Sequence, residues 1–120
     1  MTERAPAPES VEDIIKDIAK MIDSFVRCRM YSFADRLANA TNKEVIEATL
    51  YEALRVARSA LDAERPLCED ERGRIPPYVA KKESVQFVLN LLERDLLRGL
   101  ELVRKIAIRA VAFPSGKESR

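Results

Sequence analysis

Apolar residues recur at intervals of three and four positions along most of this chain, which is the spacing of one face of an α-helix. Four segments show the pattern: residues 10–30, 31–40, 42–64 and 83–111. The alternation expected of a half-buried strand is weak everywhere. The pattern therefore predicts an all-α protein, a small helical bundle of three long helices plus one short helix, the latter at residues 31–40.

Polar residues suited to capping stand at the predicted helix starts. Ser10 with Asp13, and Thr41 with Glu44, have the spacing of a capping box, in which the first side chain accepts a hydrogen bond from the amide three residues later. We expect these pairs to start the first and third helices. Ser32 is expected to cap the short helix in the same way.

The segments between the helices suggest the domain organisation. Residues 1–9 contain two prolines and no periodicity, so we expect a flexible N-terminal tail, and residues 114–120 are a polar C-terminal tail. Residues 10–113 are predicted to form a single helical domain with a connector at 65–82. Proline and glycine stop helices in this connector, and two prolines also argue against a strand at 74–79.

The residue types present narrow the chemistry. Histidine is absent, which removes histidine general bases, Ser-His and Cys-His nucleophiles and the common histidine metal sites. Cys28 and Cys68 are too few and too far apart to suggest a zinc knuckle or a CxxC redox pair. No GxGxxG, P-loop or HExxH motif occurs. We therefore expect no enzyme, no cofactor, no metal and no small-molecule substrate.

The charges and the apolar runs suggest a compartment and a class of partner. No run of eighteen apolar residues occurs, and residues 1–9 lack the apolar core of a signal peptide. A cytoplasmic protein with no membrane partner is expected. The net charge is only +1, yet arginine outnumbers lysine two to one. Many ion-pairing charges with few amides are typical of thermophiles, and the arginine fork also suits phosphate oxygens.

The last predicted helix carries a basic stripe. At about 100° per residue, Arg94, Arg98, Lys105 and Arg109 lie within roughly 60° of one another, opposite the apolar stripe. Such a ladder can follow a phosphate backbone, which requires charge and spacing but no contact with base edges. The alternative is a solvated face in which Glu101 pairs with Arg98 and Lys105.

Several large apolar residues of the same helix do not fit its core stripe and are expected to be at least partly exposed. They are Leu91, Leu97, Leu102 and Ile108. Large apolar residues outside the intramolecular face favour a partner surface. The alternative is that the short helix or the connector covers them.

Further candidate cations lie on the other helices. Tyr51, Arg55 and Arg58 face away from the apolar stripe of the middle helix, where the tyrosine could stack on a base while the arginines hold phosphates. In the alternative, the tyrosine ring packs on Arg55 and nearby glutamates neutralise the patch. Arg27 and Arg36 add positive charge around the first corner.

The acids near the start of the first helix, Asp17 among them, are interpreted as charges favoured by the helix dipole.

Four segments, in this order and spacing, resemble one known family. They are YSFADRLANA at 31–40, ATLYEALR at 48–55, LERD at 92–95 and AIRAVAFP at 107–114. Together they resemble the small subunit of the archaeal type I-A CRISPR interference complex, Cascade. The resemblance covers residues 12–114, and none of these segments is a catalytic signature.

The resemblance implies a helical subunit that repeats along a crRNA-guided complex, with the large subunit, the backbone subunits and copies of itself as partners. Its implied role is contact with the target DNA or the displaced strand without reading sequence, which stabilises the R-loop. Some members carry a larger insertion where this chain has only the 65–82 connector. The alternative function is a structural helical oligomerisation or scaffold protein, including a type III CRISPR small subunit, without nucleic-acid affinity of its own.

Overall fold

The structure is a computed structural model that describes residues 10–112, so both predicted tails lie outside the described residues. Its elements are α1 (Val11–Arg27), α2 (Ser32–Asn39), α3 (Lys43–Asp62), β1 (Cys68–Asp70), β2 (Gly73–Ile75), α4 (Lys82–Arg94) and α5 (Leu96–Ala112). The expected helical class is confirmed in its coarse form. The expected count of three long helices and one short helix is wrong, because the described residues form five helices and a two-stranded sheet.

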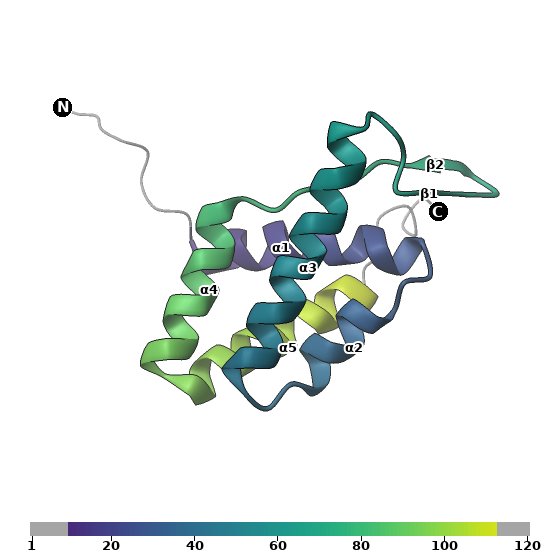
Figure 1. Cartoon of the computed structure of the whole chain (residues 1–120). Coiled ribbons are helices and arrows are strands. Elements are labelled where there is room, and N and C mark those ends of the chain that lie inside the picture. Colours follow the sequence, from purple (N-terminus) through teal and green to yellow (C-terminus); the bar gives the residue numbers. More distant parts are fainter. Residues whose placement is uncertain (1–9, 113–120) are drawn as a thin grey trace.

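Helix α5 is the centre of the packing, because it contacts α1, α2 and α4, while α3 crosses in front of α1 and α5 (Figure 1). One continuous apolar core joins the elements. On α1, Ile18, Ile22 and Phe25 are fully buried. Phe25 stacks on Phe33 of α2 with ring centroids 4.4 Å apart. The amphipathic faces predicted by the periodicity therefore meet around a single core.

The single long helix expected at 83–111 is broken at Asp95. The Asp95 amide donates to the Leu91 carbonyl at 2.7 Å and ends α4, while its Oδ1 accepts from the Arg98 amide at 3.3 Å and caps α5. Its backbone (φ −150°, ψ 89°) is not helical. One residue thus serves as the C-cap of one helix and the N-cap of the next, and the chain turns a sharp corner there (Figure 1).

Gly99 lets α4 and α5 approach each other at this corner. A Cβ built on Gly99 would lie 2.6 Å from Leu92 Cδ2 and 2.9 Å from Leu92 Cα. The second contact is with backbone, which cannot move aside as a flexible side chain can. Glycine is therefore required by a close helix approach and not by an unusual dihedral angle.

The predicted capping residues are only partly correct. Ser10 caps α1, and its Oγ accepts from the amide three residues later at 3.1 Å. For α3 the cap is Asn42, whose Oδ1 accepts at 2.9 Å, and not the neighbouring Thr41. Ser32 is the first residue of α2 and not its cap. Both Thr41 and Asn42 are good capping residues, so sequence preference alone does not decide between them.

The connector contains a β-hairpin, contrary to the expectation of no strand pairing. β1 and β2 pair antiparallel, with Cys68 opposite Ile75 and Asp70 opposite Gly73. Asp70 Oδ1 accepts from the amides of Arg72 and Gly73 and closes the turn. The two prolines follow Ile75 directly and thus lie beyond the paired residues. They end the strand without interrupting the ladder.

Two long-range links hold the connector against α1. A disulfide joins Cys28, just after α1, to Cys68 in β1. Asp17 is buried in α1 and accepts from the Tyr78 hydroxyl and, at 2.8 Å, from the Lys81 amide. The interpretation of Asp17 as a charge favoured by the helix dipole misses this role, because the connector covers the side chain and satisfies its oxygens.

Candidate nucleic-acid interface

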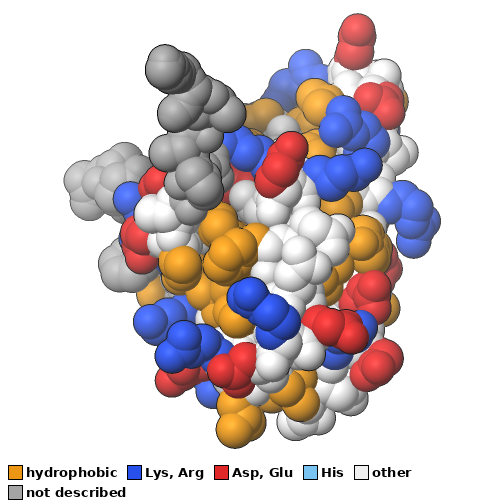
Figure 2. All heavy atoms as spheres, turned by 90° about the vertical axis from the view of Figure 1, so that its left-hand side faces the viewer, with side chains coloured by type: hydrophobic (Ala, Val, Ile, Leu, Met, Phe, Trp, Pro, Cys, Tyr) orange, Lys and Arg blue, Asp and Glu red, His pale blue; other side chains and the backbone are white. Residues whose placement is uncertain are grey.

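A hollow of about 380 Å³ lies between α1, α4 and α5. We call it the basic hollow and define it by the side chains that line it: Val11, Ile15, Phe87, Leu91, Arg94, Arg98, Glu101, Leu102 and Lys105. Figure 2 looks onto this side of the molecule, where hydrophobic side chains gather among charged ones of both signs. The hollow combines an apolar lining with cations.

The corner at Asp95 brings three of the predicted cations to this hollow. Arg94 ends α4, whereas Arg98 and Lys105 lie about two turns apart on α5. All three are exposed. The predicted geometry, a straight ladder on one helix, is wrong because the helix is broken. The result is a cluster drawn from two helices around one depression.

These three cations have no anionic partner within residues 10–112. No ion pair within 4.0 Å joins Arg94, Arg98 or Lys105 to any described residue, Glu101 included. The alternative interpretation, in which Glu101 pairs with Arg98 and Lys105, is therefore not observed among the described residues. Three cations and one carboxylate leave the lining of the hollow with positive charge.

Arg109 is separated from the other predicted cations of the stripe. It is not part of the basic hollow, and its guanidinium forms an ion pair with Glu12 of α1. This pair links the end of α5 to the start of α1. A phosphate at Arg109 would have to compete with Glu12 for the guanidinium. The role of Arg109 as a nucleic-acid contact therefore remains a prediction.

A second basic region lies on α3. Tyr51, Arg55 and Arg58 are all exposed and lie on successive turns of one helix face. Neither arginine forms an ion pair with a residue that the structure describes. None of the three lines the basic hollow. These three residues therefore form a region on an open helix face that is separate from the basic hollow.

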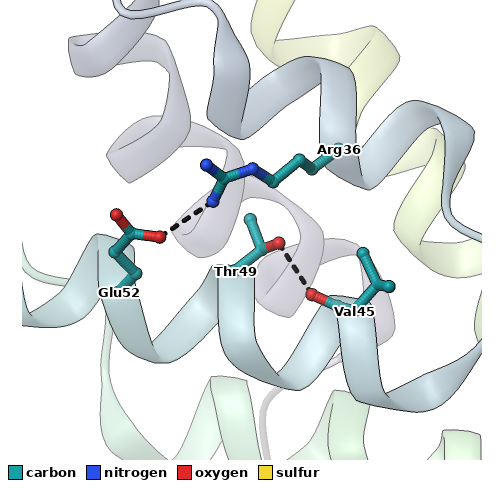
Figure 3. A network of polar contacts seen from close by, with 4 residues as sticks. All are labelled: Arg36, Val45, Thr49 and Glu52. Atoms are coloured by element: carbon teal, nitrogen blue, oxygen red, sulfur yellow. Dashed lines mark hydrogen bonds and ion pairs between the residues drawn. The ribbon is translucent and has the colours of Figure 1, made fainter.

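Arg36 serves as a link between α2 and α3. Its guanidinium pairs with Glu52 at 2.8 Å and lies 5.9 Å from the Phe33 ring. Figure 3 shows it reaching over α3 beside Thr49, whose hydroxyl donates to the Val45 carbonyl at 2.7 Å. A structural contact thus already engages this predicted site residue.

Arg27 is half-buried in the last turn of α1 and also has contacts within the chain. Like Arg36, it is not part of the basic hollow. Any contact that either arginine makes with nucleic acid remains a prediction.

The predicted partner residues differ widely in exposure. Leu97 is 79% exposed and Ile108 is 58% exposed, as the helix wheel suggested. Leu91 is half-buried at the basic hollow. Leu102 is only 6% exposed, so the expectation that it stays accessible is wrong. The broken helix places Leu102 beside α1 and α4, which cover it.

Three apolar side chains of the hollow were not predicted as part of a site, whereas its other two, Leu91 and Leu102, were predicted as partner contacts. Val11, Ile15 and Phe87 come from helices far apart in sequence, and only their packing makes a depression. Phe87 did offer one signal. It lies off the apolar stripe of its helix, and a large aromatic residue in that position is unusual for a solvated face.

One surface ion pair, between Lys43 and Glu93, shifts the pKa values of both its members. The Lys43 ammonium donates to Glu93 at 2.7 Å and joins α3 to α4. This hydrogen bond and the charge attraction lower the pKa of Glu93 and raise the pKa of Lys43. Glu93 is therefore engaged with α3, although it precedes Arg94 directly in the sequence.

Within residues 10–112, no group of three or more His, Cys, Asp or Glu side chains is placed to hold a metal ion. Over the same range, no helix combines the length and the apolar character that crossing a membrane requires.

The described residues form a small, mostly helical fold with exposed cations and exposed leucines. The family model of CRISPR-associated protein (Cas_Csa5) matches residues 21–113, which is most of the chain. The chain belongs to this family, the small subunit of type I-A Cascade, as its resemblance indicated. The family is one of structural Cascade subunits. A comparison with curated proteins and with solved structures finds no match.

Proposed function

We propose that this Cascade small subunit contacts the target or displaced DNA strand without reading its sequence and so stabilises the R-loop. The observation that supports this is the cluster of Arg94, Arg98 and Lys105, three exposed cations with no anionic partner among the described residues. Arginine and lysine bind phosphate oxygens by charge and hydrogen bonding, without reading bases.

The contact acts within the assembled complex. Three phosphate contacts on a single strand give a slope of roughly −2 in the logarithm of affinity against the logarithm of salt concentration. A net charge of +1 adds little long-range attraction. One copy alone therefore binds weakly, whereas a subunit held beside the strand by its neighbours binds at a raised effective concentration.

The test is charge reversal in the complete complex. We expect Arg94→Glu with Arg98→Glu and Lys105→Glu to abolish R-loop formation, because each substitution replaces a phosphate contact with repulsion. The matched control makes the same charge change on the connector, at Arg65, Arg72 and Arg74, and should leave the R-loop intact. An R-loop that forms normally with the first variant, or binding that does not depend on salt, would rule out the role given to these cations.

A second candidate function is structural, with no nucleic-acid affinity of the subunit's own. The observation that favours it is the exposure of Leu97 and Ile108, 79% and 58%, because large exposed apolar side chains mark partner surfaces. Light scattering of the wild type and of a Leu97→Glu, Ile108→Glu variant tests self-association. A wild type that is already monomeric would remove self-association as the use of this surface.

A further inference from the structure

The basic hollow has a composition that a purely phosphate-binding surface does not need. Its lining includes Phe87, Leu91 and Leu102, contributed by α4 and α5, with Val11 and Ile15 from α1. Its volume of about 380 Å³ is near the lower end of the range for small-ligand sites, about 300–1,000 Å³. The cations Arg94, Arg98 and Lys105 belong to this same lining.

This combination distinguishes a single strand from a duplex. The bases of a duplex are stacked inside it, so a duplex offers phosphates to the cations and nothing to the apolar lining. A single strand can turn a base out of its stack while the phosphates on either side stay with the cations. Aromatic side chains hold such bases by stacking, which is tolerant of sequence because every base has a π-face.

We propose that the basic hollow receives one unpaired nucleotide, with its base against Phe87 and Leu91 and its flanking phosphates on Arg94, Arg98 and Lys105. This inference rests on the proposed function and names the class of nucleic acid that the site takes. It makes the subunit a single-strand binder whose affinity for duplex DNA depends on its cations alone.

The charges favour a nucleotide over an apolar protein segment. A wholly apolar partner in the hollow would remove three cations from water against one carboxylate, Glu101, and buried charges without partners are costly. A nucleotide supplies both an apolar face and anionic groups. An acidic, apolar segment of another subunit has similar chemistry, and the experiment distinguishes it.

The experiment measures binding of a short oligo(dT) and of a duplex of the same length to the full chain at low salt, and R-loop formation by the complete complex. Phe87→Ala is expected to weaken oligo(dT) binding by between about fivefold and a hundredfold, the loss that corresponds to one stacked base. Duplex binding should not change. Phe87→Leu keeps the hollow apolar and guards against loss of folding, which thermal unfolding monitors. It should show the same selective loss because it lacks an aromatic ring.

Failure of the inference is distinguishable from failure of the proposed function. If Phe87→Leu leaves oligo(dT) binding unchanged, or weakens oligo(dT) and duplex equally, the base-binding role is overturned even where the cation reversal abolishes the R-loop. If Phe87→Leu instead releases the subunit from the complex while oligo(dT) binding persists, the hollow is a protein docking site and the inference is again overturned. Cation reversal without effect on the R-loop refutes the proposed function itself.

Discussion

Two connections in this molecule join neighbouring helices by opposite means. Between α4 and α5 the chain uses one residue, Asp95, and the corner is held by backbone caps and by the close approach at Gly99. Between α3 and α4 it uses residues 63–81, held by a disulfide and by hydrogen bonds to Asp17. The corner sets where Arg94 lies relative to Arg98, so it shapes the basic hollow.

The two connections are therefore expected to have different roles: the connector contributes to stability, and the corner also shapes the basic hollow. The connector folds back on α1, and none of its residues lines the basic hollow. We therefore expect changes in the connector to lower stability while leaving nucleic-acid binding at the hollow intact. Changes at the corner should affect both, because they move α4 relative to α5.

The largest effect on stability is expected from removing the disulfide. It closes a loop with a sequence separation of 40, and the chain-entropy model gives about 4 kcal/mol for a loop of this length. Cys28→Ser with Cys68→Ser should lower the free energy of unfolding by that order, measured by guanidinium denaturation. Oligo(dT) binding by the folded protein should not change.

Reductant provides the control for this prediction. It should destabilise the wild type to the level of the double serine variant and leave that variant unaffected. Equal stability of wild type and variant under oxidising conditions would contradict the prediction. Loss of oligo(dT) binding by a folded serine variant would contradict the expectation that changes in the connector leave binding at the basic hollow intact.

The next effect is expected at the corner. Gly99→Ala should destabilise by about 1–2 kcal/mol, because overpacking typically costs about 1–3 kcal/mol and the gain in helix propensity offsets up to about 1 kcal/mol. It should also weaken oligo(dT) binding, since α4 and α5 must separate. Adding Leu92→Ala should not restore binding, because the Leu92 Cα lies 2.9 Å from the new Cβ.

A second glycine provides a matched control in the connector. Gly73 has φ +135°, and a Cβ added there would meet no atom within 4 Å. Gly73→Ala therefore introduces backbone strain without a clash, at a cost on the order of 1 kcal/mol. Binding at the basic hollow should remain normal. If both glycine variants affect binding equally, the corner has no special role in shaping the site.

A smaller effect is expected at the buried anchor of the connector. Asp17→Asn keeps an acceptor for the Lys81 amide but removes the charge, and hydrogen bonds to charged groups contribute about 1.5–3 kcal/mol each. Since one acceptor remains, a loss of about 1 kcal/mol in the free energy of unfolding is expected. Tyr78→Phe, which removes the hydroxyl that donates to Asp17, should produce a similar loss. A stability unchanged in both variants would show that this anchor does not hold the connector.

The sequence predicted the features of the fold that depend on neighbouring residues. Apolar spacing revealed the helices because it repeats within each of them. The break at Asp95 could not be found this way, because Leu92 and Leu96 keep a helical spacing across it. The anchors of the connector were missed because their partners are 40 to 64 positions apart in the chain.

The same limit applies to the candidate site. Arg94, Arg98 and Lys105 were found because they lie off the apolar stripe, a local property. The hollow between them was not found, since it exists only where α1, α4 and α5 meet. Leu102 was misjudged for this reason, because its burial depends on two other helices and not on its own helix face.

The smallest effect is expected from the surface pair that links α3 and α4 beyond the connector. The lowered pKa of Glu93 means that its stabilising contribution is present above its ordinary value of 4.5 and is lost as the pH falls through the lowered value. The raised pKa of Lys43 means that its contribution is present below 10.5 and is lost as the pH rises through the raised value. Glu93→Gln should therefore be slightly less stable than the wild type at neutral pH, and this difference in thermal midpoint should vanish in strong acid. A difference that persists in strong acid would show that the charge of Glu93 is not its source, because a protonated carboxyl and an amide are both neutral.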